Sequence, residues 1–220
     1  MKPFRLLSGA AVLSAALALL PSAARAGAYE DFFVGVELDR PAIVAPLLAK
    51  GFDVNARDPR GQHALYVALR EGSMQVAELL LRTPGLQPDA VNAAGETLLM
   101  MAALRGQVKA MQRLLALGAQ VHREGWTPLH YAASGESGAA ITLLLDEGAE
   151  IDARAPSGNT PLMMAAGFGG IDGARLLLRR GADPSLKNKA GLDAAEYARR
   201  GDRGALAEEL EKRAAARLSR

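Results

Sequence analysis

Residues 125–152 read GWTPLHYAASGESGAAITLLLDEGAEID, and this stretch decides the fold. Thr127 followed by Pro128 is typical of a helix start, because the threonine can cap a free amide and proline needs no amide hydrogen at the first helical position. The alanines that follow favour a helix lying close to its neighbours. The leucine triplet 143–145 gives a second helix an apolar face, and Gly148 supplies the left-handed residue that ends it. The stretch therefore predicts two short helices followed by a turn.

The same features recur along the chain at an interval of about 33 residues. Segments that begin at Gly61, Gly95, Gly125 and Gly158 align with one another, and a degenerate copy begins at Gly191. These glycines are 34, 30, 33 and 33 residues apart. One such unit cannot bury its own apolar face, whereas a stack of several units buries a continuous core. We therefore expect an all-α repeat domain of paired antiparallel helices joined by hairpin-like loops.

Departures from the repeat mark the ends of the stack. Residues 28–60 lack the threonine-proline start but end in the turn 51–55, which is typical of an N-terminal capping unit. Residues 191–220 lose the leucine triplet and become charged, as a C-terminal cap does when its outer face meets water. The third unit has lost about three residues of its loop between His122 and Gly125. The repeats between the caps are expected at 61–94, 95–124, 125–157 and 158–190.

The recurring elements resemble the signature of the ankyrin-repeat family. The resemblance rests on the tetrapeptide Thr-Pro-Leu-His at 127–130, the turn Gly-Ala-Glu-Ile-Asp at 148–152 and the interval of 33 residues, and it covers roughly residues 28–218. It implies an ankyrin-repeat solenoid that binds another protein through hairpin tips and the concave face of its first helices, without being an enzyme. His130 of the tetrapeptide would then be a structural residue that links neighbouring repeats.

The first 26 residues differ in kind from the rest. Lys2 and Arg5 precede an uncharged apolar run at 6–20, and Ala24-Arg25-Ala26 matches a small-x-small cleavage site. We therefore expect a signal peptide over residues 1–26 and a mature ankyrin-repeat domain over residues 27–220 in the bacterial periplasm. The alternative is an uncleaved leader that tethers the protein to the inner membrane, but 15 apolar residues are few against the roughly 20 of a membrane span.

The charge balance argues against a nucleic-acid partner. The chain has 26 basic and 24 acidic residues, and loss of Lys2, Arg5 and Arg25 with the signal peptide would leave 23 basic against 24 acidic. Aromatic residues that could stack on bases are few. We expect a monomer that binds another protein, binds no nucleic acid and is not inserted in the membrane after leader cleavage. The chain has no cysteine, so its stability must come from packing.

Two aromatic residues are the first candidates for partner binding. Trp126, the only tryptophan, falls at a hairpin tip where core packing does not require it, and Phe168 falls at the exposed end of a first helix. The alternative for both is that they merely cover a neighbouring loop. Carried over from the resemblance, further contact positions on the tips and first helices are Arg57, Asp58, Arg60, Gln62, Glu96, Leu104, Arg105, Arg123, Glu124, Ser134, Arg154, Asn159, Lys187 and Lys189.

The histidines give little support to catalysis or metal binding. His63, His122 and His130 lie in different units and share no i, i+4 spacing. We expect no metal, no cofactor and no catalytic residue. A hydrolase or metal-dependent enzyme built on the repeats is the alternative, and it requires His122 or His130 to converge with carboxylates such as Asp152 or Glu136.

Two other short patterns give even weaker support to catalysis or to nucleotide binding. His130 and Ser134 are one helical turn apart but lack an evident orienting acid. The glycine-rich residues 167–170 follow a helix and lack the Gly-Lys-Ser/Thr of a nucleotide site. We therefore expect residues 167–170 to form a turn between two helices.

Overall fold

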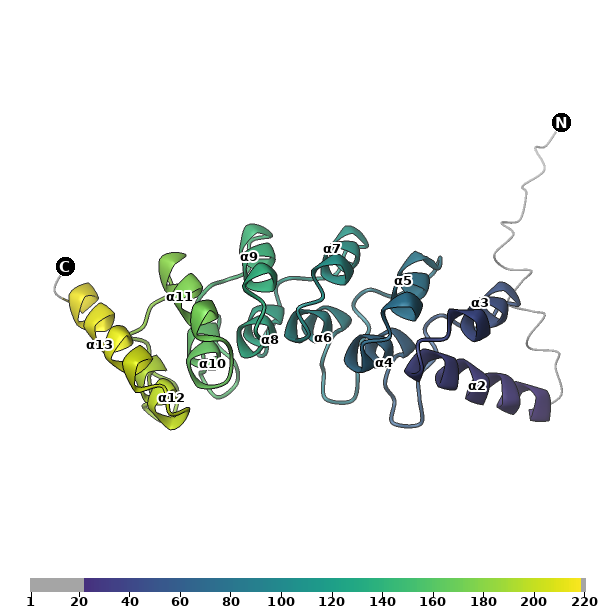
Figure 1. The fold of residues 1–220 in the computed structure, drawn as a ribbon, viewed down its shortest axis with the longest axis horizontal. Helices are drawn as coiled ribbons and strands as arrows, with labels where there is room; N and C mark the ends of the chain where they lie inside the picture. The colour runs from purple at the N-terminus through teal and green to yellow at the C-terminus, as the bar shows by residue number, and fades with distance from the viewer. Residues whose placement is uncertain (1–21, 219–220) are drawn as a thin grey trace, which may run out of the picture. The chain divides into compact units, whose positions relative to one another are not determined.

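The computed structural model describes residues 22–218, so residues 1–21 of the predicted signal peptide lie outside the described part. Residues 22–218 form twelve helices, with one isolated bridge between Arg57 and His63 and no strand. The chain divides into two units, residues 1–95 and residues 96–220. Figure 1 shows the helices with their labels. The expected all-α class is confirmed. No helix within residues 22–218 combines the length and apolar character needed to cross a membrane.

Two helix pairs make up the described part of the first unit. They are α2 (Ser22–Glu37) with α3 (Pro41–Ala49), and α4 (Ala64–Glu71) with α5 (Met74–Arg82). Helix α2 packs against α3 and α4, and Phe32 and Val36 on it are fully buried. The Phe32 ring stacks on Phe52 with the centroids 4.3 Å apart. The first helix pair thus covers one side of the second. It begins six residues before the segment 28–60 predicted as the N-terminal capping unit and overlaps most of that segment.

Helix α2 begins before the predicted cleavage bond between Ala26 and Gly27. Both residues are exposed, and a Cβ added at Gly27 would meet no atom within 4 Å. The hydroxyl of Tyr29 donates a hydrogen bond to the carbonyl oxygen of Arg57, and its ring lies 5.0 Å from that of Phe33. These contacts hold α2 in place from Tyr29 onward, on the C-terminal side of the predicted cleavage bond.

Four helix pairs make up the described part of the second unit. They are α6 (Leu98–Leu104) with α7 (Val108–Ala116), α8 (Pro128–Ser134) with α9 (Gly138–Asp146), α10 (Pro161–Gly167) with α11 (Ile171–Arg179), and α12 (Ala194–Arg200) with α13 (Gly204–Leu218). The first helices α6, α8, α10 and α12 pack in succession, and α7, α9 and α11 form a second layer (Figure 1). The core runs between the two layers, and its fully buried leucines include Leu98, Leu114, Leu129, Leu144, Leu162 and Leu177.

The helix ends follow the signals in the sequence. Thr160 precedes α10, and its side-chain oxygen accepts a hydrogen bond from the amide of Met163 at 3.4 Å, as expected of an N-terminal cap. Gly148 follows α9 with a φ of +86°, in the left-handed region that glycine adopts without strain. Local capping therefore fixes the start of α10 and the end of α9, and packing between the helix pairs fixes how they are arranged.

The glycine-rich residues 167–170 form the turn between α10 and α11, as the sequence indicated. A Cβ added at Gly169 would come 1.9 Å from the carbonyl oxygen of Ala133 in α8, which is far inside a van der Waals contact. The amide of the next residue, Gly170, donates a hydrogen bond to the carbonyl oxygen of Gly135 at 3.2 Å. Glycine is required at 169 because the backbones of two neighbouring helix pairs meet there.

We expect Gly169→Ser and Gly170→Ser to differ sharply in stability. At Gly169 the new side chain overlaps the backbone of α8, which should lower the free energy of unfolding by about 2 kcal/mol or more. At Gly170 the nearest atom to an added Cβ is 3.8 Å away. Serine suits this N-cap position of α11, so the change should stay within about 0.5 kcal/mol. Urea unfolding followed by circular dichroism measures both, and equal effects would contradict the close approach at Gly169.

Candidate functional site

Trp126 lies in the turn that leads into α8, between Gly125 and the residue Thr127 that precedes the helix. Gly125 has a φ of +81°, which turns the chain into this position. The indole is edge-on to two rings of α8, with centroids 5.3 Å from His130 and 6.4 Å from Tyr131. Yet 37% of the residue remains exposed. Trp126 is thus held on one side by α8 and offers the other side to solvent.

An apolar hollow of about 250 Å³ opens beside this indole. Its lining comes from the first helices of three successive pairs and from the turn before α8: Leu104, Trp126, His130, Tyr131, Ser134 and Met164. We call it the Trp126 hollow. The Tyr131 hydroxyl donates a hydrogen bond to the Glu96 carboxylate at 2.8 Å, which fixes the ring in the wall of the hollow. The hollow is therefore a preformed apolar depression with a partly exposed tryptophan at its edge.

Sequence reasoning placed Leu104 and Ser134 on this face but did not single out Tyr131. The sequence does contain a signal for Tyr131, which appears when the first helices are aligned by their N-cap residues. Each of Met101, Tyr131, Met164 and Tyr197 lies four residues after the N-cap of its helix, so a large side chain recurs at this position in all four first helices of the second unit. Two members of this column, Tyr131 and Met164, line the Trp126 hollow. Aligning the repeats by their caps would have found them.

Phe168 follows α10 and is 64% exposed. Its ring is edge-on to that of Tyr197 in α12, with the centroids 6.2 Å apart. Phe168 therefore covers a neighbouring side chain and also leaves most of its surface to solvent. Trp126 likewise covers neighbouring rings and remains 37% exposed, so both residues combine the two alternatives that the sequence left open. A role of either residue in binding a partner stays a prediction.

Several predicted contact residues of the second unit join neighbouring hairpins. Asn159 is 8% exposed, and its side-chain oxygen accepts hydrogen bonds from the Tyr197 hydroxyl at 2.9 Å and from the Asn188 amide at 2.8 Å. Arg154 donates to the carbonyl oxygen of Lys187 at 2.8 Å, and the amide of Lys189 donates to the carbonyl oxygen of Ser157 at 3.0 Å. These groups therefore make structural hydrogen bonds within the protein, in addition to any contact with a partner.

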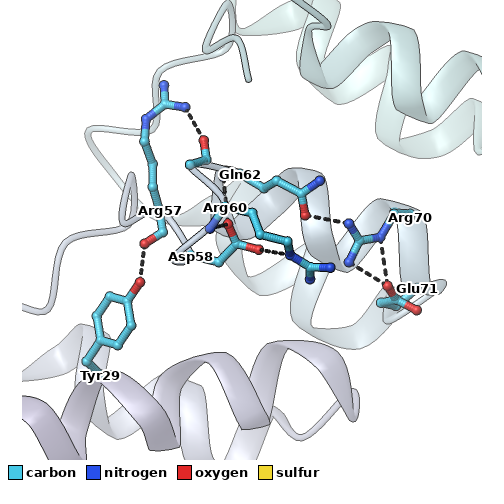
Figure 2. A network of polar contacts seen from close by, with 8 residues as sticks. Tyr29, Arg57, Asp58, Arg60, Gln62, Arg70 and Glu71 are labelled. Carbon is cyan, nitrogen blue, oxygen red and sulfur yellow. Dashed lines mark hydrogen bonds and ion pairs between the residues drawn. The ribbon is translucent and has the colours of Figure 1, made fainter. Parts of the chain in front are cut away.

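The four predicted residues of the first unit belong to one polar network, which Figure 2 shows. Asp58 is 7% exposed, and its carboxylate accepts hydrogen bonds from the amides of Arg60 at 2.9 Å and Gln62 at 2.7 Å. Arg57 donates to the carbonyl oxygens of Gly61 at 2.8 Å and Val91 at 2.7 Å. The side-chain oxygen of Gln62 accepts a hydrogen bond from Arg70. Among the four, Arg57 and Arg60 are the exposed residues, and the Arg60 side chain is 64% exposed.

The remaining predicted residues lie around three hollows of the second unit. Arg123 and Glu124 line a polar hollow of about 530 Å³ between two hairpins. Arg105 lines an open hollow of about 700 Å³ at the ends of α6 and α8. Glu96 accepts the hydrogen bond from Tyr131 at the Trp126 hollow. The structure thus brings Glu96 and Trp126 together with Tyr131, while Arg105, Arg123 and Glu124 lie at separate places.

His130 is fully buried, and both of its ring nitrogens have partners. Nδ1 accepts a hydrogen bond from the amide of Thr127 at 3.2 Å, and Nε2 donates to the carbonyl oxygen of Asn159 at 3.0 Å. Burial lowers the pKa of His130. The bond to Asn159 links one helix pair to the next hairpin, as the resemblance implied. The convergence with Glu136 or Asp152 that catalysis requires is absent at His130, because neither nitrogen bonds a carboxylate. No three His, Cys, Asp or Glu side chains within the described residues gather into a metal site.

His63 takes the N-cap position of α4, which threonine occupies before α6, α8 and α10. Its Nδ1 accepts a hydrogen bond from the amide of Leu65 at 3.0 Å, and its Nε2 lies 3.1 Å from the side-chain oxygen of Asn55. Burial lowers the pKa of His63 to about 4, and the charge of Arg57 adds to this effect. The imidazole is therefore neutral at pH 7. The cap depends on the neutral form, because Nδ1 can accept the hydrogen bond from Leu65 only while it carries no proton.

Comparison with known families gives the chain its class. The family model for ankyrin repeats (3 copies) matches residues 33–124, 84–155 and 118–188. The chain belongs to the ankyrin-repeat family. Proteins of this family are protein-interaction modules, and the helix pairs, hairpins and capped turns described above are the structural form of that repeat.

Similar sequences occur in proteins of different size. The p105 subunit of nuclear factor NF-kappa-B from Gallus gallus is 33% identical over 153 residues, which cover 66% of this chain but only 16% of the chicken protein. An ankyrin repeat-containing protein of Treponema pallidum is 30% identical over 182 residues, which cover 78% of this chain and 58% of that protein. The chain thus spans a small part of the first relative and little more than half of the second.

A solved structure of similar fold comes from a bacterial complex. It is the complex of a predatory endopeptidase from Bdellovibrio bacteriovorus with an immunity protein, and the matching chain superposes with a TM-score of 0.70 at 27% identity. The match covers 83% of this chain and 97% of that one. Here the similarity extends over nearly the whole of the matching chain.

We expect acid to destabilise the protein through His63. Because the folded-state pKa of about 4 lies below the ordinary 6.5, the unfolded chain binds the proton more readily. The stabilisation is therefore complete above pH 6.5 and is lost as the pH falls toward 4, by about 3 kcal/mol in all. His63→Thr keeps an N-cap without a titrating group, so it should match the wild type within about 1 kcal/mol at pH 7.5 and exceed it at pH 4.5.

Urea unfolding at a series of pH values measures this difference. The exposed His122 offers a matched control for the substitution itself, since His122→Thr should leave the free energy of unfolding at pH 7.5 within about 0.5 kcal/mol of the wild type. An equal loss of stability in the wild type and in His63→Thr between pH 6.5 and 4 would show that His63 does not carry the effect.

Proposed function

We propose that this chain is an exported, non-catalytic ankyrin-repeat protein that binds a cognate enzyme and restrains it, in the manner of an immunity protein. The observation that carries the proposal is the Trp126 hollow. It is an apolar depression on the first helices of the second unit, and the indole beside it is partly exposed. Such a site has the character of a binding anchor. The two reactive side chains in its lining are engaged within the protein, since the His130 nitrogens bond Thr127 and Asn159 and the Ser134 hydroxyl donates to the carbonyl oxygen of His130.

The chemistry of the hollow suits the binding of a protein. Tryptophan and tyrosine bring a large contact area at a low entropic cost, and they are enriched among the residues that dominate interface energies. The rings of His130 and Tyr131 hold Trp126 edge-on, and Glu96 holds Tyr131, so little ordering is needed when a partner binds. The hollow is large enough for one aliphatic or aromatic side chain of a partner.

The similarity to the Bdellovibrio complex supports an enzyme as the partner. That structure pairs an endopeptidase with an immunity protein, and the likeness covers most of both matching chains. The relatives of animal origin, by contrast, contain this length of repeat as a minor part of a longer protein. We therefore propose an exported endopeptidase as the cognate enzyme.

Export is the second part of the proposal. It is supported by the leader-like composition of residues 1–26 and by the Ala24-Arg25-Ala26 site. It is also compatible with the fold, because the contacts of Tyr29 and Phe32 that hold α2 lie beyond the predicted cleavage bond. Removal of residues 1–26 would leave these contacts in place.

We expect Trp126→Ala and Phe168→Ala to weaken binding to the cognate enzyme. Loss of an aromatic anchor that a partner covers in the complex costs about 2 kcal/mol, or roughly 30-fold in Kd. The source organism's exported endopeptidases would be expressed one at a time with the chain, and the complex measured by calorimetry. Met74 is as exposed as Trp126 at 37% but lies at the start of α5, so Met74→Ala is a matched control that should bind as the wild type does.

The outcomes distinguish a wrong binding site from a wrong class of partner. Wild-type affinity in both aromatic variants would show that the binding site lies elsewhere on the protein. Failure of the wild type to bind any exported endopeptidase would refute the proposed class of partner.

We also expect the exported protein to begin at Gly27. Amino-terminal sequencing of protein recovered from the periplasm measures this directly. Thermal unfolding of residues 27–220 should match that of the full chain, because the anchoring contacts of α2 start at Tyr29. Recovery of an intact leader in the membrane fraction would favour a tethered protein instead.

A further inference from the structure

Met164 lies in α10 and lines the Trp126 hollow. Among the described residues of this lining it alone contains sulfur. It is half-buried, whereas Met163 and Ala165 on either side of it in the sequence are buried. Its sulfur is 3.9 Å from the side-chain nitrogen of Asn159, which is longer than an ordinary hydrogen bond. Met164 is therefore a partly exposed methionine in the wall of the hollow.

The other methionines of the described part are buried or lie elsewhere. Residues 22–218 contain six methionines, and four of them are buried: Met100, Met101, Met111 and Met163. The sulfur of Met163 also accepts a hydrogen bond from the amide of Thr160 at 3.4 Å. Met74 is 37% exposed but begins α5 in the first unit. Within residues 22–218, Met164 is thus the one methionine that combines access to solvent with a place at the proposed binding site.

A methionine that solvent reaches is open to oxidation by peroxides. The sulfur lone pair attacks one oxygen of hydrogen peroxide, and an S–O bond forms while the O–O bond breaks. The second oxygen takes the proton of the first and leaves as water. Sulfur loses two electrons and the peroxide gains them. The product is a sulfoxide, so a flexible apolar side chain becomes a polar one with a strong hydrogen-bond acceptor.

The lining of the Trp126 hollow offers this acceptor few donors. The hydroxyls of Tyr131 and Ser134 already donate hydrogen bonds within the protein, at 2.8 Å and 2.9 Å. So does Nε2 of His130, at 3.0 Å. The remaining side-chain donor of the lining is the indole N–H of Trp126. The new oxygen would therefore lie unpaired under an apolar side chain of a partner, or it would bond the indole on which the partner is proposed to anchor.

We propose that Met164 is an oxidation site that controls the Trp126 hollow. Hydrogen peroxide converts its side chain to the sulfoxide, and the sulfoxide excludes an apolar side chain of the partner from the hollow. The inference rests on the proposed function for the existence of that partner. Enzymes specific for methionine sulfoxide reduce it again, with a dithiol as the source of electrons and water as the second product, so the change can be reversed.

Peptide mapping by mass spectrometry locates the oxidised residues. The full chain would be treated with limiting hydrogen peroxide and digested with trypsin, and tandem spectra would separate Met163 from Met164. We expect sulfoxide to form at Met74 and Met164 at least about tenfold faster than at the four buried methionines, because susceptibility follows exposure. Oxidation of Met164 as slowly as that of the buried methionines would overturn the inference.

The effect on the hollow can be measured without the partner. N-acetyl-leucine amide would be titrated into the full-length, nitrogen-15-labelled chain and followed by NMR. We expect saturable shifts at the residues that line the hollow. After oxidation the affinity should fall at least about fivefold, since the probe would then bury an unpaired acceptor.

Two substitutions make a matched pair for this titration. Met164→Leu keeps an apolar side chain of similar volume, so it should bind the probe within about threefold of the wild type and lose no affinity on treatment with peroxide. Met74→Leu removes the other accessible thioether and should lose affinity on oxidation as the wild type does.

Three results of the titration would contradict the inference. They are the absence of saturable shifts in the untreated chain, an equal loss of affinity in Met164→Leu, and an unchanged affinity of the oxidised wild type. The last is expected if the new oxygen bonds Asn159 and leaves the hollow apolar. No endopeptidase is used in these measurements, so their failure is distinct from a failure of the Trp126→Ala experiment that tests the proposed function.

Discussion

A helix pair of seven and nine residues, such as α8 with α9, is too small to enclose its own leucines and alanines. Leu129, Ala132 and Leu144 are nonetheless fully buried, because the pairs before and after α8 and α9 cover them. Burial against neighbours is thus the constraint on which the second unit depends. It explains why the backbone at Gly169 approaches Ala133 so closely, and why His130 reaches across to Asn159.

Most of the fold could be predicted from the sequence because its signals are local and repeated. Thr160 capping α10 and Gly148 ending α9 each act within a few residues, and the interval of the glycines gives the stack. The uses of Arg57, Arg154 and Asn159 could not be predicted from one repeat. Their partners lie about 30 residues away along the chain, so the sequence shows them only as polar residues at a tip.

The candidate site was predictable in part for the same reason. Trp126 was singled out because a lone tryptophan at a tip has no role in the repeat, and it is exposed as that argument required. The hollow beside it depends on side chains from α6, α8 and α10 at once, and Tyr131 becomes visible only when the helices are aligned by their caps. His63 likewise looks like an ordinary polar residue until its place at the start of α4 and its burial are known.

The short hairpin 118–127 shows that the length of a loop in this fold can change while the packing of the core is kept. The helices on either side of it remain packed, since α6 contacts α8 and α7 contacts α9 although the loop between the pairs has lost residues. Insertions and deletions at the tips therefore alter the surface while the buried leucines stay where they are. Recognition in such a protein can diverge by changes in chain length at a single loop, without compensating substitutions in the core.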